Sequence, residues 1–445
     1  MASKRIALRE TLRKLFPTAK IAALARTSGA VRRLRKVDPT ALFWTVVLGF
    51  GVGRARTLAG LRRAYEKSTG QSIEESSFYD RFTAEFARML KLAVAEALEV
   101  SLGVNRVLRG PLAAFRDVIL TDSTVVRLHE LLATAFPACR TNHTKAALKA
   151  HVILSVRGNG KQSIKITSER AHDGPVFAVG KWVKDHLLLF DLGYFRYQLF
   201  SCISRNGGYF VSRLKSNANP TIVAILRVHR GRSVPVLGQK LLDVVQRLRR
   251  EVLDVVVQVR FERRRYANRV RRATQCLRVV GIRDPKTGKH HLYVTNVPAD
   301  KLAAEDIRAT YALRWQVELL FKELKRHYRL DDMPSAKRSV VEALLHAAIL
   351  TLIVSRRLLA LARAALGQRG ERVPNQRWAA VLESVAQQLL AIVLLPPRQT
   401  RELIVRITRT LLHEAVDPNR ARPPLLVAVE NRSHRYRPHA ARLTG

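Results

Sequence analysis

The sequence predicts an α/β protein: a mixed sheet flanked by helices, interrupted by a β-rich insertion, with helical regions at both ends. Three stretches with different patterns support this prediction. Residues 41 to about 105 have helical periodicity, residues 112–216 alternate between strand and helix, and residues 301 to about 413 are helical again. Strands that alternate with helices are typical of a layered α/β core.

The helical N-terminal region is expected to span residues 1–110. One helix should end at Gly70, and Ser77 is the predicted N-cap of a long amphipathic helix that follows. Two helices joined by a short glycine-bearing turn can form a DNA-reading helix-turn-helix. They can equally be ordinary members of a helical bundle, and the sequence favours neither alternative.

Residues 111–216 are predicted to form the first part of the α/β domain. The segment DVILTDSTVVRLHE indicates a strand, a polar break and a second strand. A hairpin with a Gly-Asn-Gly turn should follow, and then a helix near 175–186. The apolar segment HLLLF is the strand that leads into Asp191, and a helix and a strand complete this part.

The β-rich insertion is predicted at residues 217–300, with three strand-like stretches and a hairpin loop that begins at Asp284. A long helix should begin after Ala303 and open the remainder of the α/β domain, residues 301–365. Residues 366–445 complete the chain as a helical C-terminal region and a basic tail that is expected to be disordered.

The charge of the chain indicates a polyanionic partner. Lys and Arg total 79 against 35 Asp and Glu, which gives a formal net charge of +44. An excess of this size repels itself unless phosphates neutralise it, so nucleic acid is the favoured partner. A ribosome-type RNA binder, or a genome that favours arginine codons, would have the same composition.

Cysteine usage and hydropathy indicate a cytoplasmic protein. Cys139, Cys202 and Cys276 are far apart and lack CxxC spacing, which argues against a zinc module and a disulfide framework. The N-terminus has no apolar signal region. The longest apolar run, about 343–354, is shorter than a membrane span needs and is predicted to be a buried core helix.

Two aspartates stand where α/β folds place functional groups. Asp122 lies at the end of one apolar strand, and Asp191 lies at the end of another, next to a turn. A carboxylate at such a position destabilises the fold unless it has a partner. Both aspartates are therefore candidate ligands or catalytic groups.

A third carboxylate, Glu318, lies on a predicted helix over residues 311–328. The spacing of Tyr311, Arg314, Glu318 and Lys325 by three, four and seven places them near one helical face. Such a face suits a helix that presents a metal ligand to phosphates. An ordinary solvated face with ion pairs four residues apart would have the same pattern.

The pattern Tyr311-x2-Arg314-x3-Glu318-x6-Lys325 resembles the YREK signature of bacterial insertion-sequence transposases of the DDE type. The block that starts at Asp191 and the Asp-Ser-Thr at Asp122 resemble the blocks that carry the first two acids of this family. The resemblance covers about 115–350.

The resemblance implies an RNase H-like catalytic domain and cut-and-paste transposition. The protein should bind the inverted-repeat ends of its own element and target DNA, act as a dimer on DNA and associate with the nucleoid. It implies that Asp122, Asp191 and Glu318 hold two Mg²⁺ ions, for which Mn²⁺ can substitute, with Asp122 bridging them. Tyr311, Arg314 and Lys325 are then expected to bind phosphates near the scissile end.

Two departures from the family pattern are visible. Leu192 follows the second aspartate, where relatives often have a polar residue. Trp182 and Trp315 both lie outside the insertion, so the tryptophan that stacks a flipped base in some relatives has no counterpart there.

Three other carboxylates compete for a place in the site. Asp173 is expected to cap the helix that starts near Pro175, and Glu323 lies one residue off the YREK face. Asp117 opens the first strand and is expected to be a solvated strand end. None of the three is predicted to belong to the site.

Weaker functional signals come from an arginine cluster, three histidines and one asparagine. Arg263, Arg264 and Arg265 belong to the densest cationic cluster and are predicted to contact DNA, although a strand edge protected by charge would look similar. His143, His151 and His172 match no trusted metal-ligand spacing and are expected to be structural. Asn296 is predicted to orient backbone after the insertion.

Two other functions remain compatible with the sequence. A catalytically inactive DNA-binding relic would keep the same fold. An RNase H-like nuclease would cut DNA without joining it.

Overall fold

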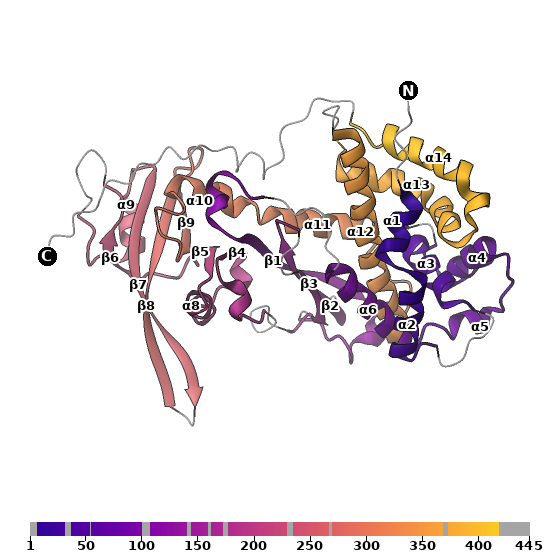
Figure 1. Ribbon diagram of the computed structural model, residues 1–445. Coiled ribbons are helices and arrows are strands. Elements are labelled where there is room, and N and C mark those ends of the chain that lie inside the picture. The colour runs from indigo at the N-terminus through magenta and orange to yellow at the C-terminus, as the bar shows by residue number, and fades with distance from the viewer. Residues whose placement is uncertain are drawn as a thin grey trace.

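The computed structural model describes residues 7–31, 37–53, 55–99, 107–139, 144–158, 162–171, 177–228, 235–266, 269–367 and 373–417. The predicted basic tail begins at Asp417, and all of it after that residue lies outside the described residues. Helices from the two ends of the chain lie together at one end of the molecule, and the sheet extends away from them (Figure 1).

The helical body combines segments that are far apart in the sequence. Its N-terminal helices are α1 (Leu8–Leu15), α2 (Thr18–Ser28), α3 (Pro39–Gly49), α4 (Leu58–Thr69), α5 (Glu75–Tyr79) and α6 (Ala84–Glu99). Its C-terminal helices are α12 (Arg338–Leu366), α13 (Asn375–Leu394) and α14 (Pro397–His413). One hydrophobic core runs through both sets, and α6 and α3 pack against α12. This arrangement confirms the predicted helical ends.

The capping residues explain where two of these helices begin and end. Gly70 adopts a left-handed conformation with φ of 71° and ends α4, as predicted. The prediction that Ser77 caps a long helix is wrong, because Ser77 lies inside the short helix α5. The long helix α6 starts at Ala84, and Thr83 Oγ1 accepts a hydrogen bond from the Phe86 amide at 3.2 Å.

The longest apolar run forms the centre of α12, as predicted for a buried core helix. Residues 343–355 are all buried. Both α12 and α13 are long and apolar enough to cross a membrane, but 78% and 56% of their most apolar windows are buried within the protein. This burial is typical of the core helices of a helical bundle.

His346 is a polar residue in this core. Its Nδ1 lies 2.6 Å from the Glu342 carbonyl, one helical turn earlier. Burial lowers the pKa of His346 from 6.5 to about 4, the Glu342 carbonyl and charge partly oppose this shift, and Lys91 adds to it. The fold therefore holds a neutral imidazole.

We expect the unfolding free energy to fall as pH drops from about 6.5 to 4. In this interval the unfolded chain protonates His346 and the folded chain does not, which costs about 3 kcal/mol at the acidic end. Chemical denaturation at several pH values checks this. The His346→Leu variant should lose that part of the slope, and an identical pH dependence in both proteins would contradict the prediction.

The sheet contains nine strands within the described residues. They are β1 (Asp117–Leu128), β2 (Ala146–Ser155), β3 (Ser163–Ser168), β4 (His186–Phe190), β5 (Tyr209–Arg213), β6 (Thr221–Ile225), β7 (Val252–Tyr266), β8 (Arg269–Arg283) and β9 (His290–Thr295). Their order is β3-β2-β1-β4-β5-β9-β8-β7-β6. Strands β1, β4 and β5 run parallel, and the remaining neighbours are antiparallel. The mixed sheet confirms the predicted α/β class.

Two elements of the first half differ from their predictions. β1 is continuous, with no polar break, because Asp122, Ser123 and Thr124 stay in register with residues 150–152 of β2. The predicted helix near 175–186 is wrong: its described part, from residue 177, contains only a short 3-10 turn at Lys181–Val183 before β4. Helix α8 (Tyr197–Arg205) and β5 follow as predicted.

The strands of the β-rich insertion continue the same sheet. β9 pairs with β5, and β8 and β7 follow it outward, with the short helix α9 (Leu241–Arg247) between β6 and β7. Residues 259–266 and 269–275 lie beyond the pairing with β6 and β9 and pair with one another. They form a two-stranded ribbon that projects from the body (Figure 1).

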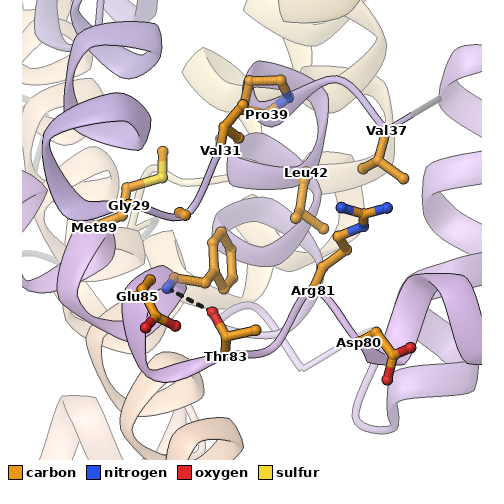
Figure 2. Close-up of a pocket in the computed structure, with 12 residues that line it drawn as sticks. Gly29, Val31, Val37, Pro39, Leu42, Asp80, Arg81, Thr83, Glu85 and Met89 are labelled. Carbon is orange, nitrogen blue, oxygen red and sulfur yellow. Dashed lines mark hydrogen bonds between the residues drawn. The ribbon is translucent and has the colours of Figure 1, made fainter. Parts of the chain in front are cut away.

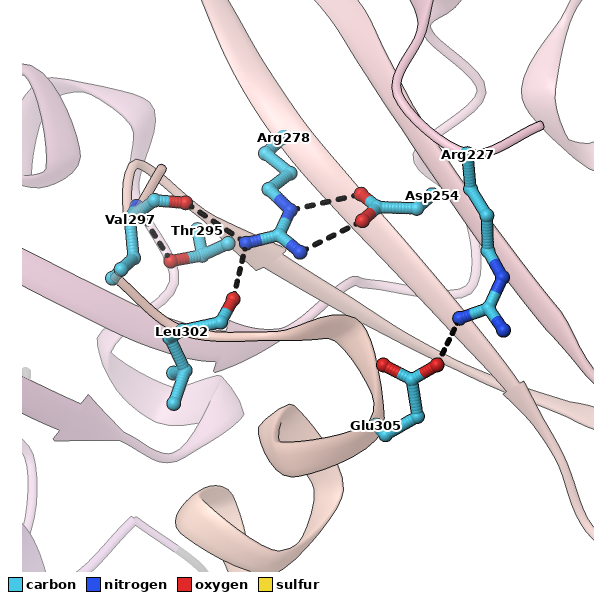
Figure 3. Close-up of polar contacts among 7 residues, drawn as sticks. All are labelled: Arg227, Asp254, Arg278, Thr295, Val297, Leu302 and Glu305. Atoms are coloured by element: carbon cyan, nitrogen blue, oxygen red, sulfur yellow. Dashed lines mark hydrogen bonds and ion pairs between the residues drawn. The ribbon is translucent and has the colours of Figure 1, made fainter. Parts of the chain in front are cut away.

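A buried arginine connects this insertion to the next helix. Arg278 on β8 donates two hydrogen bonds, of 2.8 and 2.7 Å, to the Asp254 carboxylate on β7. It also donates to the carbonyls of Val297 and Leu302 at 3.1 and 2.8 Å (Figure 3). The arginine therefore holds the chain that leads into α10 (Ala304–Ala312).

We expect Asp254→Ala to lower the unfolding free energy by about 3 kcal/mol, because it leaves the Arg278 guanidinium buried without a counter-ion. The double variant Asp254→Leu/Arg278→Met should lose less, since it buries no unpaired charge. Urea denaturation measures both. A single variant that is no less stable than the double variant would contradict this.

The predicted long helix after Ala303 consists of two helices. α10 ends at Ala312, and α11 (Trp315–Arg326) begins after Leu313 and Arg314. The amides at this junction bond three residues back, which tightens the turn. Arg314 therefore lies at the start of α11 instead of inside one continuous helix.

Candidate active site at the β1–β4 edge

Parallel pairing brings the two aspartates to the same edge of the sheet. β1 and β4 pair from Asp117 with His186 to Thr121 with Phe190. Asp122 and Asp191 are the next residues of the two strands. Two side chains from distant parts of the sequence therefore become neighbours through backbone register alone.

The third carboxylate comes from α11, which packs on β1. All three acids contact a single guanidinium, that of Arg314. Its Nη1 lies 3.0 Å from Asp122 Oδ2, and its Nη2 lies 3.9 Å from Asp191 Oδ1 and 2.6 Å from Glu318 Oε1. The structure therefore brings Asp122, Asp191, Glu318 and Arg314 together, as their predicted shared site requires.

Burial, with repulsion from the other two acids, perturbs Asp122. Burial raises the pKa of Asp122 to about 6, the Ser123 amide and Arg314 oppose the shift, and Asp191 and Glu318 add to it. The Asp122 and Arg314 side chains are each 14% exposed, against 44% for Asp191. The cluster therefore faces solvent on the side where Asp191 lies.

The donor set suits a hard divalent cation. All three acids present carboxylate oxygens, and a single guanidinium is the positive group that contacts all of them. Within the described residues no three His, Cys, Asp or Glu side chains already form a metal-sized cage. The acids instead contact the Arg314 guanidinium, so what suits a metal here is the chemistry of their carboxylate oxygens.

Tyr311 and Lys325 lie on the same side of the sheet as the acids. Burial raises the pKa of Tyr311 to about 12, and Arg314 opposes that shift. The Tyr311 hydroxyl is buried and has no hydrogen-bond partner among the described residues. Lys325 Nζ donates to the Val125 carbonyl of β1 at 2.8 Å. Both residues are thus neighbours of the acids or of their strand.

The competing carboxylates have structural partners. Glu323 is 5% exposed and pairs with Arg356 of α12. The prediction that Asp117 is a solvated strand end is wrong: it is 2% exposed and accepts hydrogen bonds from Ser155 Oγ and the Arg157 amide. Asp173 lies outside the described residues.

The predicted structural role of other residues is visible where they are described. His151 is buried and its Nε2 lies 2.8 Å from Thr167 Oγ1, whereas His143 and His172 lie outside the described residues. Asn296 orients backbone, as predicted. Its Oδ1 accepts from the Phe210 amide at 2.9 Å, and its Nδ2 donates to the Gly208 carbonyl at 2.8 Å.

The cationic cluster of the insertion lies on the projecting ribbon. Arg263, Arg264 and Arg265 belong to β7, where the register shifts between Glu262 and Arg264. Arg271 and Arg272 on the facing strand have exposed side chains. The backbone thus places the predicted DNA contacts on a two-stranded element away from the acids.

Sequence reasoning missed two neighbours of the site. Arg213 ends β5, the next parallel strand, and its charge acts on the Tyr311 hydroxyl. Its position after an apolar strand, like that of Asp191, was the available signal. Trp315 is 46% exposed at the start of α11, and Lys322 Nζ lies 4.6 Å from the centre of its ring.

A cavity of about 410 Å³ lies in the helical body, apart from the three acids. Its walls come from the end of α2, the start of α3 and the segment that leads into α6, where Thr83 caps the helix (Figure 2). None of the acids or their predicted phosphate-binding neighbours lines it.

Comparison with known proteins places this arrangement in a family. The chain is 20% identical over 379 residues to the transposase for insertion sequence element IS1151 of Clostridium perfringens, with 78% of this chain and 79% of that protein covered. It is 19% identical to the transposase for IS231B of Bacillus thuringiensis subsp. berliner, with 82% and 81% covered. A segment of 73 residues, 16% of this chain and 20% of the relative, is 36% identical to the putative transposase InsL for IS186A of Escherichia coli K12. The family described as Transposase DDE domain matches residues 113–354, which include all three acids, and the chain therefore belongs to this family of insertion-sequence transposases.

Proposed function

We propose that this transposase binds the inverted-repeat ends of its element, cleaves the DNA there and joins the ends to target DNA. The observation that carries this proposal is the meeting of Asp122, Asp191 and Glu318 within 4 Å of one guanidinium. Two of these acids reach the site through strand pairing and the third through helix packing. A family whose domain covers them all supports a shared catalytic role.

The three carboxylates would hold two Mg²⁺ ions, and Asp122, the most buried of the three, would be a ligand of both. When bound, such ions activate the attacking oxygen and stabilise the leaving oxygen of a phosphodiester. The chain itself fixes the ligands, because β1, β4 and α11 belong to one packed core. Mn²⁺ is an expected substitute.

Basic and phenolic side chains around the acids would bind the phosphates of the DNA end. Arg314 can grip a phosphate with two parallel hydrogen bonds, and Lys325 adds a point charge. The Tyr311 hydroxyl lacks a partner among the described residues and can donate to a phosphate oxygen. Arg213, at the end of β5, adds a further positive charge to this group of side chains.

The projecting ribbon would contact DNA farther from the scissile phosphate. A two-stranded ribbon fits the major groove of DNA, and this one includes the cluster at Arg263, Arg264 and Arg265. Joining two ends requires both to be held together, so a dimer on DNA is part of the proposal.

The Glu318→Gln variant should abolish cleavage and joining while the Kd for the DNA end changes by less than about threefold, which is under 1 kcal/mol. The change removes one ligand charge and preserves the size of the side chain. A strand-transfer assay with Mg²⁺ and a binding assay measure the two effects. Glu342→Gln, which alters another helical glutamate with an arginine four residues away, is the matched control.

The products of this assay also separate the alternative functions. Branched, joined DNA supports a transposase, and nicked fragments alone would indicate a nuclease. A wild-type protein as inert as Asp122→Ala would indicate a DNA-binding relic. Cleavage that persists in Glu318→Gln would remove Glu318 from the catalytic site.

The double variant Arg271→Ala/Arg272→Ala should bind DNA with a shallower salt dependence. Removing one contact to a phosphate makes the slope of log K against log salt shallower by about 0.9, so removing both should change it by about 2. Titrations at several salt concentrations measure the slope. Arg401→Ala/Arg409→Ala, on α14, is the control, and equal slopes in all three proteins would contradict a ribbon contact.

A further inference from the structure

The Arg314 guanidinium lies among the three carboxylates and contacts all of them. It contacts Asp122 at 3.0 Å, Glu318 at 2.6 Å and Asp191 at 3.9 Å. A cation that binds all three acids must displace this group. The contact therefore bears on when the site accepts a metal ion.

Without DNA, displacement of the Arg314 guanidinium by a cation is unfavourable for two reasons. The Arg314 side chain is 14% exposed, so a guanidinium pushed away from the acids would remain largely buried and lose its counter-ions. It would also lie close to the incoming divalent cation and be repelled by it. A single cation thus competes with a group that is covalently part of the site.

A DNA phosphate removes this cost. Arginine and phosphate form paired, charge-assisted hydrogen bonds, which compensate the guanidinium when it leaves the carboxylates. A buried hydroxyl that can donate to such an anion lies beside Arg314, because Tyr311 is 8% exposed and its oxygen has no partner among the described residues. The Arg314 Nε is likewise buried without a partner in the described part of the chain.

The local fold permits the exchange. Arg314 lies at the junction of α10 and α11, where its backbone is already helical, with φ of −53° and ψ of −32°. Rotation about its side-chain bonds alone can move the guanidinium. The Asp191 contact is the longest of the three, and the Asp191 side chain is 44% exposed, so a cation can enter on this side.

We propose that Arg314 is a gate that keeps divalent cations out of the three-carboxylate site until a DNA phosphate takes its guanidinium. The gate rests on the proposed function, because it assumes that these acids bind metal. Metal binding and DNA binding then strengthen one another by the same factor, as thermodynamic linkage requires. The three acids would then bind catalytic metal ions only when DNA is present.

The test measures Mn²⁺ affinity by electron paramagnetic resonance, with and without a short duplex copied from the DNA that borders the gene. Wild-type protein should bind Mn²⁺ at least about tenfold more tightly with the duplex. Arg314→Gln should bind Mn²⁺ about tenfold more tightly than wild type without DNA, and should gain less than about threefold from the duplex. The expected increase in Mn²⁺ affinity distinguishes the gate from simple disruption of the site, which would lower that affinity.

Two further variants make the outcome decisive. Arg314→Lys keeps the charge but cannot bridge three carboxylates, so its affinity without DNA should lie between those of wild type and Arg314→Gln, and it serves if Arg314→Gln does not fold. Arg338→Gln alters another arginine paired with a glutamate four residues later, and should match wild type.

The gate is overturned if Arg314→Gln, or Arg314→Lys in its place, binds Mn²⁺ no more tightly than wild type without DNA. It is also overturned if the duplex strengthens Mn²⁺ binding equally in the variant and the wild type. A separate result tests the proposed function. If Asp122→Asn binds Mn²⁺ as tightly as wild type in the presence of the duplex, the acids are not the metal site.

Discussion

Parallel pairing of β1 with β4 is the constraint on which the candidate site depends. The register that aligns Thr121 with Phe190 makes Asp122 and Asp191 the next residues at one edge of the sheet. Helix α11 then needs only to pack on β1 to bring Glu318 to the same place. A shift of this register by one residue would turn one aspartate to the opposite face.

The electrostatics of the site follow from this geometry. Burial at this edge raises the pKa of Asp122, and repulsion from Asp191 and Glu318 adds to the shift. The Arg314 guanidinium stabilises the three neighbouring carboxylates, because it donates to Asp122 and Glu318 and lies near Asp191. The cluster is thus compensated only in part, which is the condition that favours a cation of higher charge.

The rest of the molecule supports α10 and α11 from two sides. On one side, Arg278 connects the insertion strands to the carbonyls of Val297 and Leu302, just before α10. On the other side, Tyr328, just after α11, donates to Ser355 Oγ of α12. The insertion and the helical body therefore both help to determine where Arg314 and Glu318 lie.

The sequence by itself determined the α/β class, the helical ends and the identity of the grouped acids. These follow from local periodicity, from the position of Asp122 and Asp191 relative to apolar strands, and from the spacing of Tyr311, Arg314, Glu318 and Lys325. Local rules failed where long-range pairing outweighs them. Asp122 to Thr124 look like a polar break but stay in β1 because β2 pairs with them, and Asp117 is buried because Ser155 and Arg157 bind it.

Only the tertiary structure decided that the insertion extends the sheet, that the two ends of the chain share one core and that Arg314 lies among the acids. Each of these depends on contacts between residues far apart in the sequence. Helical periodicity carries no information about the break at Leu313 and Arg314, since both residues keep helical backbone angles there. The pattern could therefore predict which residues share a face, but not that one of them is an ion-pair partner of all three acids.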